Sequence, residues 1–206
     1  MILVIGKSGQ IAKALQELKP KEVVSLSRAE CDLAKPESLG AALTAHLKTG
    51  KYNCLINAGA FTQVDLAEKE RDGCHRMNAL SPPLIAKICS DHRIQFIHYS
   101  TDYVYGASGN SSITETSPCA PLNYYGKTKL AGDIGILETK TPALILRTAW
   151  VYDHRGKNFV EPNSSTQSLQ TSKTGNYLDA IARTGCNENY RGNGGQNRKP
   201  HSPMSH

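Results

Sequence analysis

The first twelve residues, Met1–Ala12 (MILVIGKSGQIA), decide the fold. An apolar run of strand length leads directly into a glycine turn, and helical spacing begins at residue 10. Such a turn leaves N–H groups at the start of the helix that can bind a pyrophosphate. In this GxxGxxA pattern Gly6 permits the tight turn, Gly9 lets the backbone approach a phosphate, and Ala12 stands where a third glycine is usual. Two glycines can also be purely structural, but their place at the start of a βαβ pattern favours a dinucleotide site.

Strand-like and helix-like segments alternate outward from this turn. Apolar runs typical of buried strands occupy residues 1–5, 22–26, 52–56, 94–99 and 142–147. Helical spacing occupies residues 10–18, 36–47, 81–90 and 123–137. The alternation predicts an α/β fold, a doubly wound, Rossmann-like parallel sheet with crossover helices. We expect Ser81 to cap the helix that continues with Pro82, and residues 99–122 to form a functional loop across the strand ends.

Composition argues against several classes of protein. The six cysteines contain no close pair, so neither a metal site nor a disulfide framework is indicated. The net charge of +6 comes from lysines and arginines spread among acids, which is not typical of nucleic-acid binding. No run of eighteen apolar residues and no signal peptide is present, so we expect a cytoplasmic protein that does not bind a membrane.

The character of the sequence changes near Glu161, after which Ser, Thr, Asn, Gln and Gly dominate. Such a segment buries too little apolar surface to offset its ordering entropy. We therefore expect an NAD(P)-binding domain at residues 1–160 and a low-complexity, disordered polar tail at residues 161–206, with the substrate domain largely missing. A frameshift or an unusual splice would produce the same change and leave a fragment whose folding is impaired.

Two further strand ends match a dinucleotide site. Arg28 follows the second expected strand, where these folds read the adenosine ribose, and an arginine there favours a 2′-phosphate. The cofactor predicted is therefore NADP(H), with NAD(H) as the alternative, although a solvated surface arginine would look the same. Asp32 is placed either to contact the adenine or to cap a turn. The third strand ends in Asn57-Ala58-Gly59-Ala60, whose small side chains leave room for the cofactor.

Tyr125 and Lys129 form a YxxxK pair on one face of the last expected helix. A nearby ammonium favours the phenolate and makes a tyrosine more useful in proton transfer near neutral pH. Many exposed helices carry this spacing by chance. The fourth strand, however, delivers Ser100 and Thr101 at its carboxyl end, where a doubly wound fold places its chemistry. The occurrence of all these motifs in this order along the chain indicates a dinucleotide-dependent active site far more specifically than any one motif does.

Together the stretches 5–12, 57–68, 98–106, 123–132 and 147–152 resemble the dTDP-4-dehydrorhamnose reductase family of extended short-chain dehydrogenases/reductases, which acts in dTDP-rhamnose biosynthesis. The resemblance covers residues 1–160. It implies a catalytic triad of Thr101, Tyr125 and Lys129, with Asp102 and Trp150 as substrate contacts. Together with the motif residues above, the expected cofactor contacts are Gly6, Gly9, Gln10, Ile11, Arg28, Asp32, Leu33, Ala58, Ala60, Phe61, Thr62, Tyr99, Tyr125 and Lys129.

The resemblance further implies hydride transfer from NADPH to C4 of a dTDP-4-keto-6-deoxysugar, which would give dTDP-L-rhamnose. Tyr125 would protonate the alkoxide, Thr101 would orient the carbonyl, and Lys129 would bind the nicotinamide ribose and lower the pKa of the tyrosine. Trp150 would offer a flat apolar face to the substrate, unless it is a core residue. We expect the polar tail to impair turnover.

Other functions stay open at this level. A nucleotide-sugar 4,6-dehydratase is disfavoured because the second acid after Thr101 is missing, since Tyr103 follows Asp102. A nucleotide-sugar epimerase shares the tyrosine and lysine. A non-catalytic NADP-binding regulatory subunit, like that of methionine adenosyltransferase, is the alternative that is not an enzyme, and the intact triad argues against it. The sugar and the oligomeric state, with a homodimer as one option, are not determined by the sequence.

Overall fold

The computed structural model describes residues 1–106 and 113–152. Its sheet has five parallel strands in the order β2-β1-β3-β4-β5. The strands are β1 (Ile2–Ile5), β2 (Val23–Leu26), β3 (Cys54–Asn57), β4 (Gln95–Thr101) and β5 (Ala143–Thr148). From β1 the chain first adds β2 on one side and then β3 on the other, so the switch point of this doubly wound sheet lies at the carboxyl end of β1. The predicted α/β fold is confirmed.

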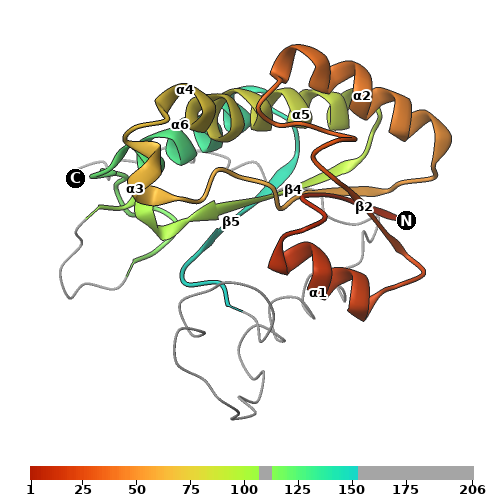
Figure 1. The fold of residues 1–206 in the computed structure, drawn as a ribbon, viewed down its shortest axis with the longest axis horizontal. Coiled ribbons are helices and arrows are strands. Elements are labelled where there is room, and N and C mark those ends of the chain that lie inside the picture. The colour runs from red at the N-terminus through yellow and green to blue at the C-terminus, as the bar shows by residue number, and fades with distance from the viewer. Residues whose placement is uncertain (107–112, 153–206) are drawn as a thin grey trace, which may run out of the picture.

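Helices cover both faces of the sheet (Figure 1). They are α1 (Gln10–Leu18), α2 (Pro36–Thr49), α3 (Val64–Ala67), α4 (Arg71–His75), the π-helix η1 (Arg76–Leu80), α5 (Ser81–Asp91), the 3-10 helix η2 (Asp102–Val104) and α6 (Tyr124–Glu138). Figure 1 shows α2, α5 and α6 on one face and α1 on the other. The predicted strands and long helices agree with these bounds to within about two residues, whereas α3, α4, η1 and η2 were not predicted.

The alternation of side chains along β1 explains the two layers of core. Leu3 and Ile5 face α2, α5 and α6 in the larger apolar cluster, whereas Ile2 and Val4 face α1 in the smaller one. All four are buried because a parallel strand with helices on both faces has no solvent side. This burial makes the carboxyl end of β1 a rigid base for the glycine turn that follows.

The expected cap at Ser81 is wrong. Helices α4, η1 and α5 follow one another without a break, and the residue before Ser81 already has helical backbone angles. The hydroxyl of Ser81 instead donates to the carbonyl oxygen of Leu33 at 2.7 Å. Pro82 and Pro83 have no N–H to donate to the preceding turn and would clash with its carbonyls in a regular α-helix. The wider π-turn of η1 accommodates them, and its last bond runs from the N–H of Ser81 to Arg76.

Candidate functional site

The glycine turn after β1 lies against the end of β3. Gly6 has a φ of 106°, which favours glycine, and a Cβ there would come within 3.0 Å of the Gly59 nitrogen and 3.1 Å of Ala58. The turn is closed by a bond from the Gly9 N–H to the Gly6 carbonyl at 2.8 Å. The two small-residue motifs therefore meet at the switch point, where the start of α1 faces outward.

The start of α1 fits a dinucleotide phosphate. Gly9 is the N-cap of this nine-residue helix, and its first turn carries no acidic side chain that would repel an anion. Of the other predicted contacts, Ile11 is half-buried at the edge of the smaller core. The Oε1 atom of Gln10 is buried and has no hydrogen-bond partner in the described part of the chain, so it can accept from a bound hydroxyl or amide.

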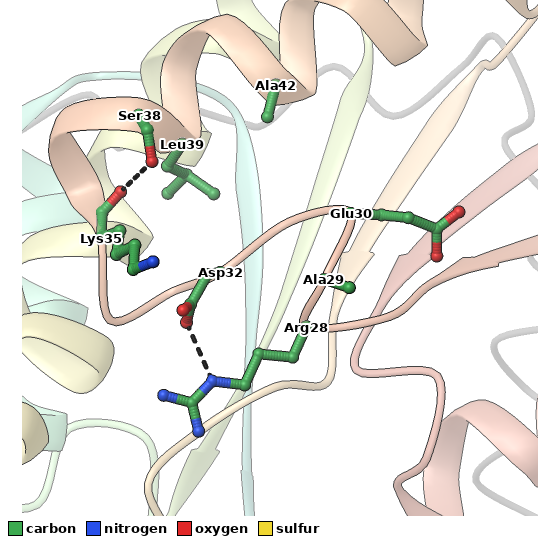
Figure 2. Close-up of a pocket in the computed structure, with 8 residues that line it drawn as sticks. All are labelled: Arg28, Ala29, Glu30, Asp32, Lys35, Ser38, Leu39 and Ala42. Carbon is green, nitrogen blue, oxygen red and sulfur yellow. Dashed lines mark hydrogen bonds and ion pairs between the residues drawn. The ribbon is translucent and has the colours of Figure 1, made fainter.

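A pocket of about 470 Å³ opens beyond β2 (Figure 2). Its lining residues are Arg28, Ala29, Glu30, Asp32, Lys35, Ser38, Leu39 and Ala42. The Arg28 Nε atom donates to Asp32 Oδ1 at 3.2 Å, which is drawn in Figure 2, and the arginine side chain is 73% exposed. The carboxylate of Glu30 is occupied by two bonds from Ser27. Arg28 and Lys35 are therefore the cationic groups of the pocket that remain accessible to a phosphate.

The segment that follows β3 is tied down by a side chain that the sequence did not point to. Asn78, on η1 and 1% exposed, donates to the Phe61 carbonyl at 3.0 Å and accepts from the Phe61 N–H at 2.9 Å. These two bonds fix the predicted cofactor contacts at residues 60–62 above the strand end. Leu33, by contrast, is 4% exposed and lies in the larger core beside Gly59, so its side chain faces the core.

The predicted Thr101 and Tyr125 meet at the carboxyl end of β4. Asn123 caps α6 by accepting from the Gly126 N–H at 2.8 Å, and Gly126 lets this helix start approach the Tyr103 carbonyl in η2. The Tyr125 hydroxyl lies near the Thr101 side chain, and its ring packs edge-on against Tyr103 with centroids 5.6 Å apart. Thr101 also donates to Asp102 Oδ1 at 3.1 Å. A hydroxyl pair at this position can bind a carbonyl oxygen.

Lys129 is 1% exposed, and its Nζ atom donates to the Tyr99 carbonyl at 2.7 Å and lies 3.2 Å from His98 Nε2. Burial lowers the pKa of Lys129 to about 8. The structure differs here from the expectation that Lys129 lowers the pKa of Tyr125. Burial raises the pKa of Tyr125 above its ordinary value, the nearby Thr101 hydroxyl opposes this rise, and Asp102 adds to it. The lysine ammonium is directed at β4 and does not set this balance.

Two polar side chains that no sequence motif pointed to, His98 and Asp133, lie beside Lys129. His98 is fully buried between Asn57 and Lys129, and the carboxylate of Asp133 accepts from Ser100 and from Arg147. The sequence feature that could have indicated this buried polar cluster is His98 itself, a histidine inside the apolar run of residues 94–99. Asp133 follows Lys129 by one helical turn, which would have placed it on the same face.

Trp150 is 66% exposed and has a φ of 49°, two residues beyond the end of β5. The alternative that it is a core tryptophan is therefore wrong. Asp102 is partly exposed at the start of η2, beside Thr101. In residues 1–106 and 113–152 we find no group of side chains able to hold a metal ion and no helix that could span a bilayer. The predicted tail lies outside the described residues.

Replacing Lys129 by methionine is expected to remove a gain of stability at alkaline pH. The pKa of this lysine is about 8 when folded and 10.5 ordinarily, so between these values the unfolded chain binds more protons. The folded protein therefore gains stability as pH rises through this window. Urea denaturation below pH 8 and near pH 10.5 measures the gain. Lys127→Met, at an exposed position of the same helix, is the control and should keep it. An equal pH slope in Lys129→Met and the unchanged protein would contradict the assignment.

A glycine turn, a small-residue strand end and a tyrosine–lysine helix at one edge of a parallel sheet define a nucleotide-binding protein of the short-chain dehydrogenase/reductase class. Comparison with known proteins is more specific: the chain belongs to the family described as RmlD substrate binding domain, which it matches over residues 1–172. The resemblance stated from the sequence is thereby confirmed.

The chain is similar to proteins named dTDP-4-dehydrorhamnose reductase. It is 37% identical to that of Escherichia coli over 162 residues, which are 78% of this chain and 54% of the relative. It is also 37% identical to that of Burkholderia thailandensis, over 77% of this chain and 53% of the relative. The solved structure of the Bacillus anthracis protein in complex with NADP superposes with a TM-score of 0.70 at 30% identity, over 77% of this chain and 56% of that one. The chain spans about half the length of the curated relatives it matches.

Proposed function

We propose that this chain binds NADP(H), less tightly NAD(H), and reduces the 4-keto group of a dTDP-4-keto-6-deoxysugar to give dTDP-L-rhamnose. The observation that carries the proposal is the meeting of Thr101 and Tyr125 at the end of β4, on the same edge of the sheet as the glycine turn. The Bacillus anthracis relative holds NADP on this fold. The division into a binding domain at residues 1–160 and a polar tail stays a prediction.

The residues of the chain fit the steps that the reaction needs. The reduced nicotinamide supplies the hydride at its C4 atom. With substrate bound, the Thr101 hydroxyl turns its proton from Asp102 to the substrate carbonyl, and Tyr125 donates its proton to the oxygen as negative charge develops there. A phenol with a raised pKa is fully protonated near neutral pH, so Tyr125 is in the state that this step requires. Asp102 and Trp150 are proposed to contact the sugar nucleotide.

The remaining proposed contacts position the cofactor. Gly6, Gly9 and Gln10 would hold the pyrophosphate at the start of α1. In the pocket of Figure 2, Arg28 would bind the 2′-phosphate of the adenosine ribose and Asp32 would contact the adenine. The small residues Ala58 and Ala60 leave space for the nicotinamide half. Lys129 would bind a hydroxyl of the nicotinamide ribose. Its Nζ atom lies at the Tyr99 carbonyl on β4, two residues before Thr101.

Fluorescence titration with NADPH and turnover of the keto-sugar test the proposal together. Saturable NADPH binding with consumption of NADPH only when the sugar is present is the expected result. An epimerase would retain its cofactor, so isomerisation without net consumption of NADPH would contradict the reductase function. Binding without any reaction, also in a chimera that carries the Escherichia coli relative's residues after position 160, would favour the regulatory alternative.

Arg28→Ala is expected to weaken NADPH binding far more than NADH binding. Loss of a charge-assisted bond of roughly 1.5–3 kcal/mol lowers affinity for the 2′-phosphate by roughly 10- to 100-fold. NADH lacks this phosphate, so its affinity should change little. Lys48→Ala, at an exposed position in the last turn of α2, removes the same charge away from the pocket and is the control. Equal weakening for both cofactors would contradict phosphate recognition by Arg28.

A further inference from the structure

The carboxylate of Glu68 joins two segments of the proposed active site that lie far apart in the sequence. Glu68 is the C-cap residue of α3, in the segment that continues from the predicted cofactor contacts at residues 60–62. Its Oε1 atom accepts a hydrogen bond from the backbone N–H of Tyr124 at 2.7 Å. Tyr124 is the first residue of α6, and the residue after it is the proposed proton donor, Tyr125.

The start of α6 needs an acceptor from another part of the chain. The first N–H groups of an α-helix have no partner within the helix. Asn123 accepts from the Gly126 N–H at 2.8 Å, and Glu68 accepts from the Tyr124 N–H. The first turn of α6 contains no acidic residue of its own. Glu68 therefore supplies, from α3, the negative charge that stabilises the beginning of a helix.

Arg71 holds the carboxylate of Glu68 in this orientation. Its Nη2 atom donates to Glu68 Oε2 at 2.9 Å, and its Nε atom donates to the Glu68 carbonyl at 3.2 Å. The same guanidinium lies over the Tyr124 ring, 4.9 Å from the centroid. The bond from the Tyr124 N–H and the bond from Arg71 lower the pKa of Glu68, and Lys127 acts in the same direction. The carboxylate is therefore charged near neutral pH, with one oxygen for Arg71 and the other for α6.

The position of the Tyr125 hydroxyl depends on the position of this first helical turn. Helices α3 and α4 pack against α6 (Figure 1), and on its other side Gly126 lies against the Tyr103 carbonyl. A shift of the helix start therefore moves the Tyr125 ring along the ring of Tyr103 and changes its distance from Thr101. A displacement of about 1 Å between reacting groups can lower a rate by roughly 10²-fold.

We propose that Glu68 is a positioning residue for the reaction proposed above: its bond to the Tyr124 N–H fixes the Tyr125 hydroxyl relative to the segment that carries the cofactor contacts. Asn78 holds the other end of that segment through the backbone of Phe61, so the segment is tied at both ends. Glu68 itself contacts neither cofactor nor substrate in this role. The role rests on the proposed function, and it requires a side chain that reaches α6.

Three substitutions at position 68 separate reach from charge. Glu68→Gln keeps an oxygen that can accept from the Tyr124 N–H but loses the charge, whereas Glu68→Asp keeps the charge on a side chain shorter by one methylene. Glu68→Ala removes both. We expect Glu68→Gln to behave like the unchanged chain and Glu68→Asp to behave like Glu68→Ala. Glu70→Ala is the control, because this neighbouring carboxylate is exposed and makes no capping bond to α4.

The first measurement needs neither cofactor nor substrate. In the full chain, nuclear magnetic resonance gives the hydrogen-exchange rate of the Tyr124 N–H and the ring resonances of Tyr125, the latter assigned by their loss in Tyr125→Phe. We expect Glu68→Ala and Glu68→Asp to speed exchange by roughly 2- to 30-fold, the range for loss of a helix cap, and to shift the Tyr125 resonances. If the Tyr125 resonances stay in place while exchange is faster, Glu68 only stabilises the helix start and the proposal fails. Should Glu68→Ala not fold, Glu68→Asp and Glu68→Gln still decide it.

The second measurement is turnover of the keto-sugar with NADPH titration on the same preparations. We expect kcat to fall by roughly 10-fold or more in Glu68→Ala and Glu68→Asp, with NADPH affinity within about twofold, and both quantities to be restored in Glu68→Gln. An equal loss in Glu68→Gln and Glu68→Asp would assign the effect to charge and overturn the proposal. If the unchanged chain itself shows no turnover, the proposed function fails, whereas the Tyr125 resonances still decide whether Glu68 positions that residue.

Discussion

Tyr125→Phe is expected to lower the turnover of the keto-sugar by roughly 10²- to 10⁴-fold, the contribution typical of a positioned general acid. The substitution removes only the hydroxyl that lies near Thr101 and leaves the ring against Tyr103. Affinity for NADPH should therefore stay within about twofold, because no phosphate contact is touched. Steady-state rates and fluorescence titration on the same preparation measure both quantities.

Tyr124→Phe is the matched control for this experiment. Tyr124 precedes Tyr125 at the start of α6, and its ring lies under the Arg71 guanidinium at 4.9 Å, away from Thr101. Its hydroxyl should be dispensable. The same pair of substitutions in the chimera with the relative's residues after position 160 gives a second background. Near-native turnover by Tyr125→Phe in either background would remove Tyr125 from the mechanism.

Gly132→Ala is expected to lower the free energy of unfolding by about 2–3 kcal/mol, the usual cost of forcing an extra carbon into a packed interior. A Cβ at this position of α6 would overlap the carbonyl oxygen of Asn78 on η1. That carbonyl belongs to the π-turn that precedes Pro82 and Pro83, and backbone atoms cannot move aside as a flexible side chain can. Urea denaturation gives the change.

Gly73→Ala provides the opposite result from the same substitution. Gly73 also lies in a helix, α4, but a Cβ there meets nothing within 4 Å. The variant should be more stable by roughly 0.5–1 kcal/mol, because alanine loses less backbone entropy in a helix than glycine does. Equal effects at the two positions would show that helix propensity, and not the contact with η1, governs Gly132.

The sheet could be predicted from the sequence because its strands are short apolar runs that end in recognisable turns. Burial on both faces leaves no polar residue in β1 and only Asn57 at the end of β3, and the glycines at positions 6 and 9 mark the first crossover. The long helices could be predicted from the helical spacing of their residues. These features are local, so each can be read from a few neighbouring residues.

The parts that could not be predicted depend on contacts between distant segments. The π-turn of η1 accommodates two prolines that sequence patterns usually place at a helix start, which is why the expected cap at Ser81 was wrong. The YxxxK spacing correctly placed Tyr125 and Lys129 on one helix, but not the direction of the lysine side chain. That direction is set by His98 and by the Tyr99 carbonyl on β4, thirty residues away in the sequence.

The order of the strands has a consequence for how the chain reaches this structure. Every neighbouring pair is parallel, so no strand can pair with the next through a tight hairpin, and each pairing must wait for a crossover to close. Folding dominated by such distant pairings is slow. During synthesis β1 and β2 are available to each other first, and the opposite edge of β1 stays uncovered until residues 54–57 emerge. In the interval between those events the unpaired backbone N–H and C=O groups at this edge of β1 are exposed to other chains, so aggregation in the cell should depend on the translation rate across residues 27–53.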